Sequence, residues 1–183
     1  MVTTSSLQLT DRNLILTGYI EPNKPRIGRQ VAELLNMPFV DMEERIQDRM
    51  GDGIEALRET FGERHLKTVE DELMAEMILH RKTVLRINGS ILAQSDYLPR
   101  LQETGPVICP VARLDAILQK IHLTLGARYH NPAERGVELG KLRREWAIRN
   151  RENIYELDAT DLGEETLISA IIDLWQEVAI QRI

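Results

Sequence analysis

The chain has 183 residues, which suits one globular domain, and 43% hydrophobic with 28% charged residues indicates a folded, soluble protein. Its formal net charge of −6 argues against a nucleic-acid partner, since phosphate neutralisation requires clustered Lys and Arg. A single cysteine, Cys109, excludes an internal disulfide and offers no metal-ligand spacing. No apolar run approaches the roughly 20 residues of a membrane span, so we expect no membrane association and a cytoplasmic location.

Short apolar runs alternate with amphipathic stretches along the chain. Residues 1–12 are polar and are expected to form a lead-in to a single domain over residues 13–183. Strands are predicted, in order, at 13–17, 38–41, 83–87, 107–111 and 153–158. Helices are predicted at 25–35, 42–50, 53–61, 62–81, 113–125, 137–150 and 164–181, with a partly helical stretch at 91–103 and a loop at 126–136. This alternation predicts an α/β fold with a five-stranded parallel sheet flanked by helices.

The turn after the first strand contains part of a phosphate-binding motif. A phosphate-binding loop reads G-x-x-x-x-G-K-[ST] between a strand and a helix. Here Gly18 and Lys24 hold their places, whereas Asn23 replaces the second glycine and Pro25 replaces the hydroxyl residue. The context is therefore right, but the motif itself is incomplete.

The surrounding sequence resembles the shikimate kinase family over nearly the whole chain. The matching segments are the Gly-Arg pair and following strand in 28–41, the helix residues 53–57 and 61–63, the equivalent of Phe-Arg-x-x-Glu at 66–70, the position of a triple-glycine turn at 86–90, and Gly105–Val107 before the fourth strand. The resemblance implies a P-loop kinase fold of the nucleoside monophosphate kinase type. It also implies ATP-dependent phosphorylation of shikimate with Mg²⁺.

The same resemblance assigns roles to residues on the ATP side. It places Gly18 and Lys24 at the phosphates and Asp41 at the magnesium ion. Lys120 falls near a position that packs on adenine, and Arg128 near a lid arginine that stabilises the transition state. Arg26 would add attraction for the phosphates from a different geometry.

On the shikimate side, the resemblance points to four residues. Glu43 stands at a second acid and is one methylene longer, while Lys67 replaces an arginine and loses its bidentate fork. Gly89 is the surviving glycine of the triple-glycine turn, which has become Ile87-Asn88-Gly89. Arg144 is the best match for a late substrate arginine. Its competitors are Arg143, Arg149 and Arg151, and a solvated helix face is the alternative reading for each.

The phosphate loop departs furthest from the family pattern. Pro22 and Pro25 lack the backbone N–H groups that such a loop directs at phosphate oxygens, and Glu21 adds a negative charge nearby. Losing two or three hydrogen bonds to a charged group, at roughly 1.5–3 kcal/mol each, would remove several kcal/mol of phosphate affinity. Pro25 is also a favourable first residue of a helix, so the loop can persist as a structural connection alone.

These departures favour a shikimate-kinase-like pseudoenzyme. It would have lost efficient ATP-dependent phosphoryl transfer and would bind a protein partner or a small anionic ligand. The alternative is an active small-molecule kinase that uses ATP and Mg²⁺, with Lys24, Asp41, Glu43 and Lys67 as its working groups. A structural subunit of a larger assembly is a third hypothesis.

Overall fold

The computed structural model describes residues 11–18 and 26–181, and their centre is a sheet of five parallel strands. The strands are β1 (Leu14–Leu16), β2 (Phe39–Asp41), β3 (Val84–Arg86), β4 (Val107–Val111) and β5 (Ile154–Asp158). They lie in the order β2-β3-β1-β4-β5, and every pairing is parallel. The predicted α/β class and strand number are confirmed.

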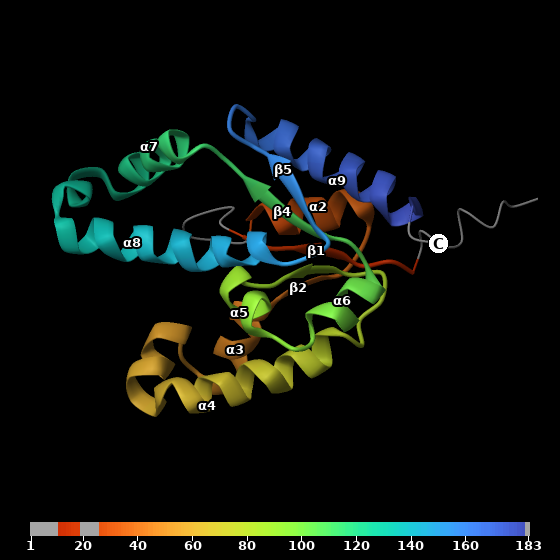
Figure 1. Cartoon of the computed structure of the whole chain (residues 1–183), viewed down its shortest axis with the longest axis horizontal. Helices are drawn as coiled ribbons and strands as arrows, with labels where there is room; N and C mark the ends of the chain where they lie inside the picture. The colour runs from red at the N-terminus through yellow and green to blue at the C-terminus, as the bar shows by residue number, and fades with distance from the viewer. Residues whose placement is uncertain (1–10, 19–25, 182–183) are drawn as a thin grey trace, which may run out of the picture.

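Helices connect the strands and cover both faces of the sheet (Figure 1). In chain order they are α2 (Arg26–Leu35), α3 (Met42–Met50), α4 (Ile54–Met77), α5 (Gly89–Gln94), α6 (Leu98–Thr104), α7 (Leu114–Leu125), α8 (Pro132–Glu145) and α9 (Glu164–Gln181). Two short 3-10 helices, η1 (Gly126–His130) and η2 (Trp146–Asn150), lie on either side of α8. In Figure 1, α7 and α8 extend beyond the sheet on one side.

Alternate residues of the central strand face two separate hydrophobic clusters. Ile15 belongs to the cluster under α3, α4, α5 and α6, whereas Leu14 and Leu16 belong to the cluster under α2 and α9. All three side chains are fully buried. Because side chains alternate along a strand, this apolar run suits a strand covered on both faces. The edge of the sheet where the strands end is left for the connecting loops.

The region between α7 and α8 differs from the prediction. The sequence predicts a loop over 126–136, but η1 occupies its first part and α8 already begins at Pro132. The side chain of Asn131 accepts a hydrogen bond from the backbone N–H of Ala133 at 3.0 Å. Asparagine at the cap and proline at the first helical position are both favourable, so these residues start a helix here.

The long helix α4 contains the break that the sequence predicts near residue 62. Gly62 has φ 80° and ψ 167°, which is far from helical geometry, and the chain changes direction there. Glycine reaches positive φ at little cost, which permits this kink. The two parts of α4 therefore run in different directions, and side chains of the first part, among them Arg58, line the cleft described below.

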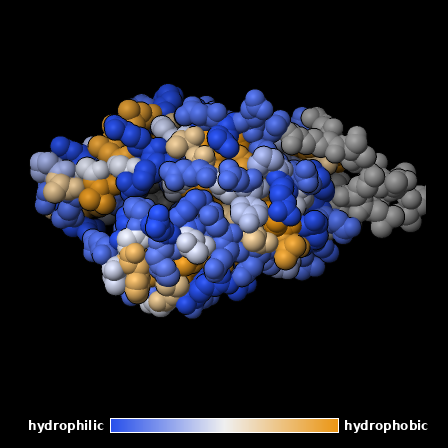
Figure 2. Space-filling view, turned by 60° about the horizontal axis from the view of Figure 1, so that its bottom comes forward, coloured by the Kyte–Doolittle hydropathy of each residue, from blue (hydrophilic) through white to orange (hydrophobic). Residues whose placement is uncertain are grey.

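The outer surface is largely polar on the face shown in Figure 2, where hydrophobic residues stand in small separate groups. In the described ranges, no helix combines the length and apolar character needed to cross a membrane.

Candidate functional site

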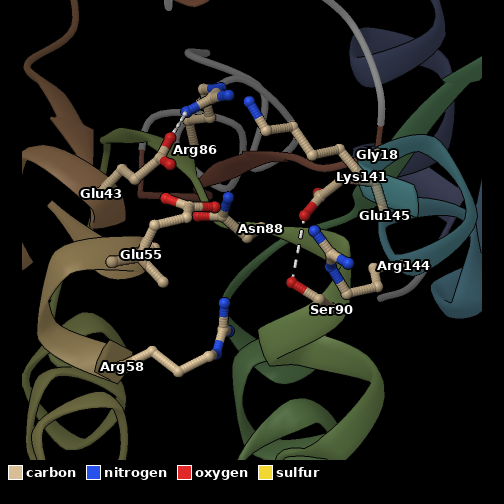
Figure 3. Close-up of a pocket in the computed structure, with 11 residues that line it drawn as sticks. Gly18, Glu43, Glu55, Arg58, Arg86, Asn88, Ser90, Lys141, Arg144 and Glu145 are labelled. Carbon is tan, nitrogen blue, oxygen red and sulfur yellow. Dashed lines mark hydrogen bonds and ion pairs between the residues drawn. The ribbon is translucent and has the colours of Figure 1, made fainter. Parts of the chain in front are cut away.

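A cleft lies at the edge of the sheet where β1, β2 and β3 end, between α4 and α8 (Figure 3). In a parallel sheet this edge collects the loops that bind ligands. The cleft is strongly polar. Its lining residues are Gly18, Glu43, Ile54, Glu55, Arg58, Arg86, Asn88, Ser90, Lys141, Arg144 and Glu145.

The deepest charged contact beside the cleft joins Asp41 to Arg86. These residues end the neighbouring strands β2 and β3 and are direct partners in the strand register. Arg86 Nη1 donates to Asp41 Oδ2 at 2.7 Å, and the Asp41 side chain is 1% exposed. The other carboxylate oxygen, Oδ1, accepts from the backbone N–H of Glu44 at 2.9 Å and caps α3. Each oxygen of Asp41 therefore already accepts one hydrogen bond from within the chain.

Arg86 also contacts the second acid of the site. Its Nη1 lies 3.4 Å from Glu43 Oε2, so one guanidinium faces two carboxylates. Burial lowers the pKa of Arg86. The negative charge of Asp41 and its hydrogen bond outweigh this effect, so the pKa of Arg86 is above its usual range. The side chain is a permanent cation between the two acids.

This arrangement does not fit a magnesium ion held by Asp41. Mg²⁺ requires oxygen ligands with near-octahedral geometry, and an Asp41 oxygen would have to meet that geometry while Arg86 and the Glu44 N–H hold the same carboxylate. A cation 2.7 Å from the carboxylate would also repel the metal. Within the part of the chain that the structure describes, no group of three or more His, Cys, Asp or Glu side chains could hold a metal ion.

A third carboxylate, Glu145, enters the cleft from the end of α8. It accepts from the backbone N–H of Gly89 at 2.6 Å and from Ser90 Oγ at 3.1 Å. Burial raises the pKa of Glu145, although these two hydrogen bonds act in the opposite direction. A Cβ atom on Gly89 would lie 2.0 Å from the backbone oxygen of Glu145, so this close approach requires glycine.

Three further cations line the cleft. Lys141 Nζ lies 3.1 Å from Glu138 Oε1, and Arg58 Nε lies 2.5 Å from Glu63 Oε1. Arg144 has no ion pair with any residue of the described ranges. Figure 3 shows Arg58 and Arg144 entering the cleft from α4 and α8, while Lys141 extends toward Arg86.

Asn88 adds an acceptor to this set of cations. Its Oδ1 atom is buried beside the cleft and has no hydrogen-bond partner among the described residues. A buried oxygen of this kind ordinarily finds a donor. The cleft thus offers an anion-binding guanidinium and an unsatisfied acceptor, a combination suited to a small molecule that carries both an acid group and hydroxyls.

The sequence predictions for the site divide into two groups. Glu43, Arg144 and Gly18 line the cleft, and Gly89 lies next to it between Asn88 and Ser90. Of the late arginines, Arg144 is the one in the lining; Arg149 instead pairs with Glu156 at 2.7 and 2.9 Å.

The other predicted residues lie away from the cleft or outside the described ranges. Lys67 pairs with Asp71 at 2.6 Å, and Arg128, with 65% of its side chain exposed, lies 3.6 Å from Glu134. Lys120 is exposed on α7, and Arg26 is exposed on α2, where it pairs with Glu164. Lys24, with Glu21, Pro22, Asn23 and Pro25 of the loop, lies outside the described residues.

Sequence reasoning missed Arg58, Arg86, Lys141 and Glu145. A signal existed for two of them, since Lys141 precedes Arg144 by three residues and Glu145 by four, and both spacings bring side chains together on a helix. Arg86 lies one residue before the end of a predicted strand, and Asp41 ends another, but only the pairing of β2 with β3 brings them together.

The shikimate kinase family model matches residues 23–174, which is most of the chain. The chain belongs to the shikimate kinase family. A curated shikimate kinase from Thermodesulfovibrio yellowstonii is 24% identical over 176 residues, covering 92% of this chain and 97% of that protein. The predicted family is confirmed.

Solved shikimate kinases share the fold. The crystal structure from Bacteroides thetaiotaomicron has a TM-score of 0.70 at 19% identity and covers 91% of this chain and 97% of its own. The Acinetobacter baumannii enzyme in complex with shikimate has a TM-score of 0.66 at 25% identity and covers 95% and 94%. The P-loop kinase fold predicted from the sequence is therefore confirmed.

Proposed function

We propose that this member of the shikimate kinase family binds a small hydroxylated acid in its cleft and does not catalyse efficient ATP-dependent phosphoryl transfer. The observation that carries the proposal is the Arg86–Asp41 pair. A guanidinium occupies the one carboxylate, at the end of β2, that the family resemblance assigns to Mg²⁺. In phosphoryl transfer the metal neutralises the charge that develops between the phosphates, so a site closed to it loses a principal source of catalysis.

The phosphate loop supports the same proposal independently. Its sequence carries Pro25 where a magnesium-binding hydroxyl is expected, and Pro22 and Pro25 donate no N–H. The two expected protein ligands of the metal are therefore compromised for different reasons: one is replaced by proline, and the other is paired with arginine.

The substrate side of the cleft keeps groups suited to a hydroxylated acid. Arg144 lines the cleft without an ion-pair partner among the described residues, and Asn88 Oδ1 accepts no hydrogen bond from any of them. The related structure from Acinetobacter baumannii was solved with shikimate, which makes shikimate the first ligand to test. Binding without transfer is thus the function that this combination of residues favours.

The alternative is an active kinase, and the retention of Lys24 and Asp41 favours it. The deciding experiment incubates the purified full chain with Mg-ATP and shikimate and follows phosphorylated product and ADP. We expect product no faster than in a blank without protein, together with a rise in Tm when shikimate alone is added. Product formation that depends on Mg²⁺ and is abolished by Lys24→Ala would establish the active kinase instead.

A further inference from the structure

Glu145 is a carboxylate held inside the cleft in the way that proteins hold the acid group of a ligand. Its two oxygens accept from a backbone N–H of Gly89 at 2.6 Å and from the hydroxyl of Ser90 at 3.1 Å. Both donors are the first two residues of α5, which follows β3 and lies opposite the helix that carries Glu145 (Figure 3). Hydrogen bonds from fixed donors to an ionised oxygen are the strong kind.

The charges around Glu145 are those of an anion site as well. Arg86 faces it from the end of β3 and attracts it, while Glu43 faces it from α3 and opposes it. Its own helix contributes Lys141 and Arg144 to the same lining. The lining therefore has four cationic side chains and three carboxylates, and among these carboxylates Glu145 is the one that accepts from the backbone N–H of Gly89.

We propose that Glu145 is a specificity-determining residue that fills, from within the chain, a subsite able to hold the carboxylate of a ligand. The donors Gly89 N–H and Ser90 Oγ–H are then closed to a small carboxylic acid in the native protein. This inference rests on the proposed function, because it concerns the cleft in which a hydroxylated acid would bind.

The consequence concerns how a ligand can lie in the native cleft. With the Gly89 and Ser90 donors filled, the acid group of a ligand is left with the guanidinium of Arg144, supported by Arg58 across the cleft. A hydroxyl of the same ligand can donate to Asn88 Oδ1, which has no other partner in the described ranges. Removing the Glu145 carboxylate would open a second position for a carboxylate.

The first test is rescue of Glu145→Ala by acetate in the full-length chain. Thermal unfolding is compared in sodium acetate and in sodium chloride at equal ionic strength for the native chain, Glu145→Ala and Glu145→Gln. Acetate should raise the Tm of Glu145→Ala above its value in chloride, because the ion fills the vacated donors. It should leave the native chain and Glu145→Gln unchanged, since the glutamine side chain still fills the position: its amide oxygen can accept from Gly89 N–H, and its NH2 group can donate to Ser90 Oγ. Glu134→Ala, on the same helix but paired with Arg128, is the matched control.

The second test measures shikimate affinity by calorimetry for the same proteins. Glu145→Ala should bind shikimate about tenfold more tightly than the native chain, the gain expected from one additional charge-assisted contact, and Glu145→Gln should not. A purely structural role for Glu145 would lower stability without increasing affinity. If Glu145→Ala does not fold in either salt, Glu145→Asp, which withdraws the carboxylate by one methylene, must show the same gains.

The inference is overturned if acetate acts equally on all variants, or if no Glu145 variant binds shikimate more tightly than the native chain. Phosphoryl transfer is assayed separately on the native protein. An active native enzyme would refute the proposed loss of catalysis while leaving the Glu145 result to be judged on acetate rescue and affinity alone.

Discussion

Replacing Arg86 with alanine should cost about 3 kcal/mol of unfolding free energy. Removing one partner of a buried ion pair leaves the other charge uncompensated, at a cost of about 3–5 kcal/mol. The Asp41 side chain is 1% exposed and the Arg86 side chain 17% exposed, and because water reaches Arg86 we take the lower end of that range. For a chain of 183 residues, 3 kcal/mol corresponds to a fall in Tm of roughly 6–12 °C.

Urea denaturation followed by tryptophan fluorescence measures this loss, because Trp175 is buried at 5% exposure. The matched control is Arg49→Ala, which removes an arginine that also contacts two acids, Glu72 at 3.5 Å and Glu76 at 2.5 Å. Those side chains are 34% to 62% exposed, so the control should cost less than about 1 kcal/mol. Equal losses for Arg86→Ala and Arg49→Ala would refute the reasoning, since they would mean that the Asp41 pair behaves as a surface contact.

Three further changes test other parts of the account. Gly89→Ala should destabilise by at least about 1–3 kcal/mol because its Cβ would lie 2.0 Å from a backbone oxygen, whereas Gly136→Ala, with open space around its Cβ, should stabilise α8 by roughly 0.5–1 kcal/mol in the same urea titration. Burial raises the pKa of Glu145 above its ordinary 4.5, so the folded chain releases this proton less readily than the unfolded chain. The native protein therefore loses stability as the pH rises above about 4.5. The stability of Glu145→Gln relative to the native chain should increase between about pH 4 and about pH 8. Arg144→Ala should weaken shikimate binding in calorimetry by about tenfold, while Arg143→Ala, its exposed neighbour, should leave the affinity unchanged.

Local sequence patterns were sufficient for most of the fold. The strand at 107–111 and the helices at 42–50 and 164–181 have the predicted bounds, because each combines a clear apolar period with a recognisable end. The error at 126–136 arose because Asn131 and Pro132 also occur in loops, and their effect depends on whether a helix follows. Asparagine and proline are favoured both in turns and at the start of helices, so these residues alone do not distinguish the two.

Less of the site could be predicted from the sequence, because its main ion pair, between Asp41 and Arg86, joins residues that are far apart in the chain. The sequence places Asp41 at the end of one predicted strand and Arg86 one residue before the end of another, but it does not show that these strands are neighbours in register. Nor does helical spacing reveal that Glu145 would meet the backbone N–H of Gly89, 56 residues earlier in the chain. Arg144 was accessible because the family resemblance fixed its distance from the last strand.

The most direct measurement of the central claim is the rate of shikimate phosphorylation by the purified chain at saturating Mg-ATP, with the family member from Thermodesulfovibrio yellowstonii as positive control. We expect no product above the protein-free blank, with shikimate binding detected in the same preparation. Turnover that requires Mg²⁺ and disappears in Lys24→Ala would contradict it, because Asp41 would then have to serve a metal despite its pairing with Arg86.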